Sequence, residues 1–343
     1  MTHETRDERT FLPAPATLEL TLRYPLPWFS AGAGTSSRIG ANSAHPHAPS
    51  PLAVRGWRAP GVARFGGWPV AADPQRAATA LRFLTLWLVV GDGPATEAEL
   101  LAAIRGDDAA APERPGEPEG FDPRHACAPA RPEPALRAWW ETARRYRAAM
   151  GPGWCARLAD DFADWQAASR GELAWTAKIQ AGGYPSREEL LQIRAAAVGA
   201  GPALDLLEYV ADCPLPLAVR EHPALASVRR YAARLLAIQD DVAGAAEDLA
   251  EGRPNLLGCL LRGERLRPSA AAAELEALHD ESLCGLTGAS QLLRAEFPRC
   301  EPLARWLREV HALCHGFARW HGHDPRRVRL PHGATLAIEL EYV

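Results

Sequence analysis

The amino-acid sequence predicts an all-α protein, and three observations support this prediction. From Asp73 onward, apolar residues recur at the three- and four-residue spacing of an amphipathic helix. Before the tail TLAIELEYV, almost no stretch shows the two-residue alternation of a half-buried strand. The stretch 227–261 is long and amphipathic, with apolar side chains on one side and acidic side chains on another. We therefore expect a single helical bundle.

The composition is that of a globular protein. The chain has 343 residues, of which 47% are apolar, and a formal net charge of −4, which argues against a nucleic-acid surface as the main partner. No apolar run reaches the roughly 18 residues of a membrane span, and the N-terminus is polar, so we expect neither a membrane span nor a signal peptide. The seven cysteines lack a C-x-x-C pair, which predicts reduced thiols and a cytoplasmic protein.

The N-terminal part of the chain shows little helical periodicity. We expect residues 1–20 to form a flexible arm and residues 21–343 to form the helical domain. Residues 24–68 are rich in Pro, Gly, Ser and His, a composition that is ordinarily typical of a linker. They contain the segments YPLPWF, 24–29, and HPHA, 45–48, each of which is compatible by itself with an ordinary proline turn.

A helix is expected from Asp73, because apolar residues recur along PQRAATALRFLTLWLVV. Its aromatic residues Phe83 and Trp87 have two interpretations. They are either core residues or part of the wall of a pocket, where a ring face can attract a cation. The helix runs directly into GDGPAT, residues 91–96.

Residues 105–134 are rich in Pro, Glu and Ala and have no periodicity, which predicts a surface or disordered loop. The acid pair Asp107-Asp108 lies in this segment, but such a composition rarely builds a rigid site. Helical periodicity resumes over residues 135–146 and again over residues 154–175.

A further helix is expected to begin near Ser186, because Ser186 and Glu189 have the spacing of a capping box. The sequence GAGP at 199–202 should break or bend its continuation. Arg194 lies on this helix. Its planar, permanently charged fork matches phosphate oxygens, although a surface arginine in an ordinary helical ion pair is the alternative.

The central amphipathic stretch carries two acids on one face. Asp240 and Asp248 are eight residues apart, so at roughly 100° per residue they lie within about 80° of each other around the helix. Two carboxylates placed in this way can share a hard cation such as Mg²⁺. The alternative is a solvated acidic face.

Two more helices are expected near the C-terminus, over residues 269–297 and 302–320. A nearby group of thiol and imidazole side chains contains the residue types that bind zinc. Their spacing is not that of a regular zinc site, and a solvated turn is the simpler interpretation. The group comprises Cys314, His315, His321 and His323.

The central stretch, with Asp240, Asp241, Gly244 and Asp248 followed by Pro-Asn-Leu-Leu at 254–257, resembles the second magnesium-binding motif of bacterial class I terpene synthases. In that family the helix has the form Asn/Asp-Asp-xx-Ser/Thr-xx-Lys-Glu and continues into Asn-Leu-Val. Gly244 departs from the motif because it has no hydroxyl, so a metal there would need a water molecule in that position.

Other segments resemble the same family in the same order. Arg194 precedes Asp240 by 46 residues, the separation at which the family places its diphosphate-sensing arginine. The arrangement Gly316-xxx-Trp320 followed by Arg326 resembles the C-terminal signature in which an arginine binds diphosphate. The Pro-rich segment 24–48 resembles the N-terminal strand of the family, which implies a cap over the mouth of the helical domain.

The run 157–165 resembles the family helix that precedes the sensor helix, which would place Asp160 and Asp161 on an outer, solvated face. The end of the first helix corresponds to the aspartate-rich first metal motif. Asp92 matches its second acid, whereas Gly91 and Ala95 replace two others.

At the C-terminus, Arg327 stands where the family has tyrosine. The resemblance implies a single-domain class I terpene synthase bundle around a central apolar cavity, with Mg²⁺ as cofactor. It implies ionisation and cyclisation of a prenyl diphosphate, of sesquiterpene or diterpene length, with release of diphosphate. The alternative is a silent or repurposed homologue that binds a terpenoid or prenyl diphosphate or acts on a diphosphate-free terpenoid.

The oligomeric state, monomer or homodimer, stays open. The residue roles that follow from the resemblance are catalytic for Arg194, Arg326 and Asp92; metal-binding for Asp240, Gly244 and Asp248; and substrate-binding for Phe83, Trp87, Arg194 and Arg326.

Overall fold

The computed structural model describes residues 17–24, 53–54, 57–58, 75–77, 79–80, 82–83, 86, 97–107, 132–321, 326–329 and 335–342. Over these ranges the chain is mainly helical, and the prediction of an all-α bundle is confirmed. The helices are α3 (Glu97–Arg105), α4 (Pro132–Ala149), α5 (Pro152–Gln180), α6 (Arg187–Ala197), α7 (Ala200–Val210), α8 (Leu217–Arg220), α9 (Pro223–Glu251), α10 (Leu256–Gly258), α11 (Pro268–Glu296) and α12 (Glu301–His321).

A small sheet accompanies the helices. Strand β1 (Thr17–Tyr24) pairs in parallel with β5 (Thr335–Tyr342), and β5 pairs antiparallel with β4 (Arg326–Arg329). Strands β2 (Ala53–Val54) and β3 (Trp57–Arg58) form a separate pair. Strand β1 packs against α11 and takes in residues 17–20, the end of the segment predicted as an arm. Residues 1–16 lie outside the described residues.

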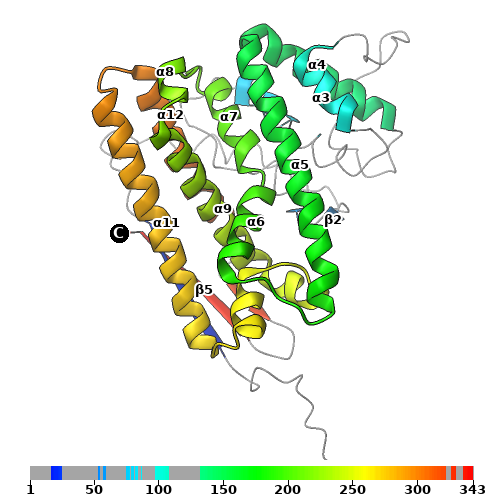
Figure 1. Ribbon diagram of the computed structural model, residues 1–343, viewed down its shortest axis with the longest axis vertical. Helices are drawn as coiled ribbons and strands as arrows, with labels where there is room; N and C mark the ends of the chain where they lie inside the picture. The colour runs from blue at the N-terminus through cyan, green and yellow to red at the C-terminus, as the bar shows by residue number, and fades with distance from the viewer. Residues whose placement is uncertain are drawn as a thin grey trace, which may run out of the picture.

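Helices α5, α6, α9 and α11 lie side by side (Figure 1), each in contact with the next. Helix α9 is central, because it also packs against α7 and α12. Its apolar residues Ile238, Val242 and Leu249 belong to a buried cluster with side chains from α6, α10 and α11. This packing sets the C-terminal half of α9 against α6.

Both ends of α9 follow from local chemistry. The helix begins at Pro223, and the side chain of His222 accepts a hydrogen bond from the Ala224 amide (3.2 Å). Proline suits this first helical position because its φ angle is already helical. The helix ends at Glu251, since Gly252 adopts a left-handed φ of 68°. The predicted stretch to residue 261 is therefore completed by α10 and a π-helical turn, Cys259–Gly263.

The predicted start and break of α6 are confirmed. The Ser186 hydroxyl accepts a hydrogen bond from the Glu189 amide (3.3 Å). Gly199, with φ 80°, separates α6 from α7, and the two helices are bent by 41°. In the described part of the chain, no single helix has both the length and the apolar character to cross a membrane; α6 and α7 meet those criteria only together, as a bent pair.

A cluster of aromatic rings fills the core beside α4 and α5. The Phe83 ring is wholly buried and stacks on Trp139, with centroids 4.4 Å apart, while Tyr146 and Phe162 meet it edge-on. Burial of each such side chain contributes about 2–3 kcal/mol to folding. Phe83 therefore has the packing of a core residue. Trp87 lies outside the described residues.

Candidate functional site

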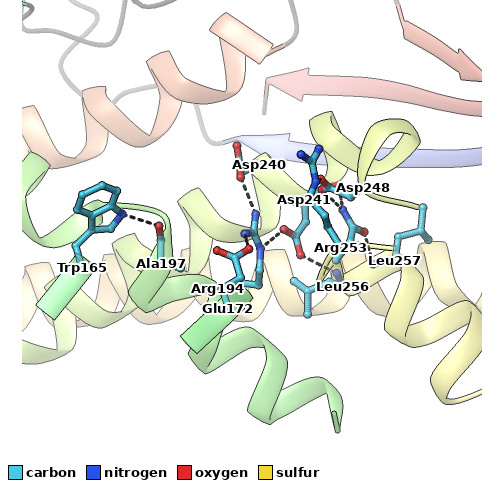
Figure 2. A network of polar contacts seen from close by, with 11 residues as sticks. Trp165, Glu172, Arg194, Ala197, Asp240, Asp241, Asp248, Arg253, Leu256 and Leu257 are labelled. Atoms are coloured by element: carbon cyan, nitrogen blue, oxygen red, sulfur yellow. Dashed lines mark hydrogen bonds and ion pairs between the residues drawn. The ribbon is translucent and has the colours of Figure 1, made fainter. Parts of the chain in front are cut away.

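Arg194 is the centre of the polar network between α5, α6 and α9 (Figure 2). Its side chain is only 8% exposed, and it contacts three carboxylates. Nη2 lies 2.7 Å from Asp240 Oδ2, Nε lies 2.5 Å from Asp241 Oδ1, and Nη1 pairs with Glu172. The alternative of a surface arginine in an ordinary ion pair is therefore wrong.

The acids keep Arg194 charged despite its burial. Burial by itself is the largest influence and lowers the pKa of the guanidinium, but Asp241, Glu172 and Asp240 together hold that pKa well above its usual value. Removing a single partner from a buried pair of this kind typically costs about 3–5 kcal/mol, because it leaves an uncompensated charge.

Asp241 joins this arginine to the loop after α9. Its Oδ2 accepts a hydrogen bond from the Leu256 amide (2.7 Å), and its backbone carbonyl accepts one from Asn255 Nδ2 (2.8 Å). Burial raises the pKa of the Asp241 carboxyl to about 7, against the opposing effects of Arg194 and the Leu256 amide. In the sequence Asp241 stands out only as one residue of the resembling motif, although its place three residues after Ile238 puts a charge on the apolar stripe of α9.

Asp248 is held by two different groups. Its Oδ1 lies 2.9 Å from Arg253 Nε, and its Oδ2 accepts a hydrogen bond from Asn255 Nδ2 (2.9 Å). The side chain is 14% exposed, and burial raises the pKa of its carboxyl, while Arg194, Asn255 and Arg253 oppose that rise. The Asp248 carboxylate is thus mostly buried, and its two oxygens bind protein groups rather than solvent alone.

Gly244 leaves room that Asp248 occupies. A Cβ atom built on Gly244 would lie 2.9 Å from Asp248 Oδ2. A serine or threonine at this position would therefore force the carboxylate to move. The departure at Gly244 is consistent with the rotamer that Asp248 adopts.

The structure brings Arg194, Asp240 and Asp248 to one place, as the sequence predicts. Asp240 and Asp248 both act on the charge of Arg194. The Asp240 side chain is 20% exposed and, like Asp248, lies in ion pairs rather than on a freely solvated face.

Other predicted site residues cannot be placed against this network. Arg326 is the first residue of β4 and lies opposite Ile338 of β5 in the strand register. Its side chain is outside the part of the chain that the structure describes. The side chain of Arg327 lies outside it as well, and so do Gly91, Asp92 and Ala95. Their predicted roles remain predictions.

The acid pair in α5 divides between two environments. Asp160 is 67% exposed and pairs with Arg105 (2.8 Å), as expected of an outer face. The same prediction is wrong for Asp161, which points inward and pairs with Arg229; Arg229 also contacts the buried Asp205 (2.9 Å). Burial and the charge of Asp205 raise the pKa of the Asp161 carboxyl to about 7.

The zinc alternative gains no support from α12. Burial raises the pKa of the Cys314 thiol to about 12, so the thiolate that zinc requires is disfavoured. The side chains of His321 and His323 lie outside the described residues. Within the described part of the chain, no group of three or more His, Cys, Asp and Glu side chains is arranged to hold a metal ion.

The helical bundle is the all-α fold of class I terpene synthases. The family model described as terpene synthase family 2, C-terminal metal binding, matches residues 91–284, more than half of the chain. The chain belongs to this family.

Two curated relatives are each 28% identical to the chain over short segments. Terpene cyclase 4 of Gibberella fujikuroi matches over 97 residues, 28% of this chain and 27% of that protein. The (+)-eremophilene synthase of Sorangium cellulosum matches over 137 residues, 40% of this chain and 41% of that protein. The matched segments therefore span well under half of either relative.

Solved structures share the fold over most of the chain. The linalool/nerolidol synthase of Streptomyces clavuligerus superposes with a TM-score of 0.61 at 21% identity, covering 76% of this chain and 87% of that one. The 2-methylisoborneol synthase of Streptomyces coelicolor, in complex with Mg²⁺ and geranyl-S-thiolodiphosphate, gives 0.62 at 23% identity, covering 79% and 85%.

Proposed function

We propose that this protein binds a prenyl diphosphate together with Mg²⁺ at the acidic face of α9, ionises it and cyclises the resulting carbocation, with release of diphosphate. One observation carries the proposal: the Arg194 guanidinium lies 2.7 Å from the Asp240 carboxylate. A guanidinium of the kind that binds phosphate and a carboxylate of the kind that binds Mg²⁺ thus meet between α6 and α9. The expected substrates are the precursors of sesquiterpenes and diterpenes.

The side chains present supply the donor type that suits a hard divalent cation, but among the described residues no three of them are arranged around a common metal position. Six carboxylates, those of Glu172, Asp240, Asp241, Glu247, Asp248 and Glu251, contact the two guanidiniums, so acidic groups outnumber basic ones in this network. Carboxylate oxygens are the donors that Mg²⁺ prefers, with water in the remaining positions. Asp240 and Asp248 would hold the ion, and Gly244 would leave its position to water. Bound there, Mg²⁺ would neutralise charge on the departing diphosphate.

The chain's own groups have three tasks in this proposal. Arg194 offers a planar fork to the diphosphate oxygens, and Arg326 is the second candidate for that task. Asp241 and Glu172 hold Arg194 in place before the diphosphate arrives. Preorganised charges of this kind lower the barrier to ionisation, because they need not reorganise during the reaction. Aromatic side chains of the first helix, with Trp87 as the candidate, would stabilise cationic carbon.

The first experiment incubates the purified protein with geranyl, farnesyl and geranylgeranyl diphosphate, in Mg²⁺ and in EDTA. Products are extracted for gas chromatography, and released pyrophosphate is assayed. We expect a metal-dependent terpene product, and a loss of about 100-fold or more in rate for Asp248→Asn. Asp160→Asn is the matched control, because Asp160 is an exposed acid that pairs with Arg105 on the outer surface.

A second candidate function is binding without turnover, or action on a diphosphate-free terpenoid. Gly244 favours it, because no hydroxyl is present between Asp240 and Asp248. Folded protein that binds Mg²⁺ and pyrophosphate but yields no product from any of the three substrates would support binding alone. Activity on a terpenoid that persists in EDTA would support the diphosphate-free reaction.

A further inference from the structure

Arg253 is the second arginine of the acidic site, and the proposed function leaves it without a task. It follows Gly252, so its side chain folds back along the last turns of α9 (Figure 2). Each nitrogen of its guanidinium contacts a different carboxylate. Nε lies 2.9 Å from Asp248 Oδ1, Nη1 lies 3.1 Å from Glu251 Oε2, and Nη2 lies 3.2 Å from Glu247 Oε1.

These contacts are not what holds the chain in place. The Arg253 amide already donates to the Asp248 carbonyl (2.8 Å), and the Asn255 side chain already binds Asp248 Oδ2. The side chains of Glu247 and Glu251 are 50% and 55% exposed, and ion pairs with such partners contribute little to stability. The guanidinium can therefore exchange Glu247 and Glu251 for a stronger anion at small cost; the Asp248 contact is the one mostly buried pair among the three.

Arg194 and Arg253 act on the same carboxylate from different elements. Burial raises the pKa of the Asp248 carboxyl, and both arginines oppose that rise, one from α6 and the other from the loop after α9. The Arg253 side chain is 24% exposed, whereas that of Arg194 is 8% exposed. An anion that approaches Asp248 from solvent therefore meets Arg253 as the more accessible of the two forks, and a guanidinium binds phosphate oxygens in a bidentate manner.

We propose that Arg253 is a diphosphate-binding residue that covers Asp248 in the free protein and transfers its guanidinium to the diphosphate when substrate binds. This inference rests on the proposed function. The exchange uncovers Asp248 Oδ1 for a cation and gives the diphosphate a second arginine. Cation and diphosphate then each bind more tightly in the presence of the other, as any such coupling must be reciprocal.

The test is isothermal titration of inorganic pyrophosphate, in the presence of Mg²⁺, into wild type, Arg253→Gln and Arg253→Lys. Arg170→Gln is the matched control, because Arg170 is an exposed arginine that pairs with Glu97. We expect Arg253→Gln to weaken pyrophosphate binding about 10- to 100-fold, the usual loss of a hydrogen bond to a charged group. Mg²⁺ alone should bind this variant at least as tightly as wild type. Arg253→Lys should fall between the two, and the control should match wild type.

Two contrary results separate this inference from the proposed function. If wild type and Arg253→Gln bind pyrophosphate equally well, Arg253 is only a brace for the end of α9, and the inference is overturned. If wild type itself binds no pyrophosphate in Mg²⁺, the proposed function fails first. Circular dichroism checks that each variant is folded. If Arg253→Gln does not fold, the comparison of wild type with Arg253→Lys decides the question.

Discussion

Asp240 and Asp241 are neighbours in the chain and contact the same guanidinium, but their surroundings differ. Asp241 points along the apolar stripe of α9, where its carboxylate is fully buried and bonded to both Arg194 and the Leu256 amide. Asp240, one residue earlier and about 100° away around the helix, keeps part of its side chain in solvent. The two acids therefore differ in their setting: Asp241 is buried between Arg194 and the Leu256 amide, whereas Asp240 pairs with Arg194 at the edge of the solvent.

This difference predicts unequal costs for two matched truncations. Asp241→Ala leaves the Leu256 amide and one nitrogen of Arg194 without their partner, and should lower the free energy of unfolding by about 3–5 kcal/mol. Asp240→Ala should lower it by about 1 kcal/mol, since Arg194 keeps Asp241 and Glu172. Urea unfolding followed by circular dichroism measures both values. Equal losses for the two variants would contradict the assignment.

At the scale of elements, the junction between α9 and α10 depends on one side chain. Asn255 Oδ1 accepts hydrogen bonds from the Leu257 and Gly258 amides and so caps α10. Its Nδ2 donates to the Asp241 carbonyl and to Asp248 Oδ2. An amide is required, because only an amide supplies an acceptor and two donors at once.

Asn255→Ala should cost about 1–2 kcal/mol through the lost cap. Asn255→Asp keeps the cap but sets a carboxylate against Asp248, so at pH 8 it should cost more, about 3 kcal/mol, because buried groups lose their donor. Thermal unfolding midpoints at pH 8 and pH 5.5 measure the effect. The gap between the variants should narrow at the lower pH, where the new acid can take up a proton. If Asn255→Asp proved more stable than Asn255→Ala at pH 8, the two hydrogen bonds that Asn255 Nδ2 donates would contribute little to stability.

The ends of the elements could be predicted from sequence wherever a local signal exists. The capping box at Ser186 and the break at Gly199 depend on neighbouring residues only, and both predictions are confirmed. Strand β1 was missed, although Leu18, Leu20 and Leu22 alternate along it. Its partner is β5, with Thr17 opposite Thr335, and no local pattern reveals a pairing over that separation.

At the scale of the whole molecule, site residues could be predicted where they belong to a local motif and could not be predicted where they depend on contacts between distant segments. The acids of α9 and Arg194 were identified because each belongs to a local motif, and packing of α6 on α9 brings them together. Asp161 was misplaced, because its partners Asp205 and Arg229 come from α7 and α9. Arg253 carries no motif at all. Its contact with Asp248 depends on the turn at Gly252, which folds Arg253 back along α9.

Buried acids in three places give the whole molecule a common pH dependence. Burial raises the pKa of the Asp161, Asp241 and Glu309 carboxyls to about 7 in the folded chain, whereas unfolded carboxyls titrate near 4. Between these two values the folded state binds more protons than the unfolded state, so the free energy of unfolding falls as pH rises toward 7. Burial lowers the pKa of His279 and His311, which opposes this trend below about pH 6.5 because charging them favours unfolding.

Thermal unfolding midpoints should therefore decline from pH 5.5 to pH 8, because the three acids outnumber the two histidines that oppose them. Glu309→Gln should flatten that decline, because an amide of the same shape does not titrate, and should leave the Arg194 network intact because Glu309 lies on α12. The comparison of wild type with this variant over pH 5.5–8 isolates the share of one buried acid from that of Asp161 and Asp241. A wild-type midpoint that rises steadily from pH 6 to pH 8 would mean that these acids are ionised in the folded chain at pH 6. The guanidiniums beside Asp161 and Asp241 would then outweigh burial, and the surplus negative charge around Arg194 would be present in full for a cation at every pH in that range.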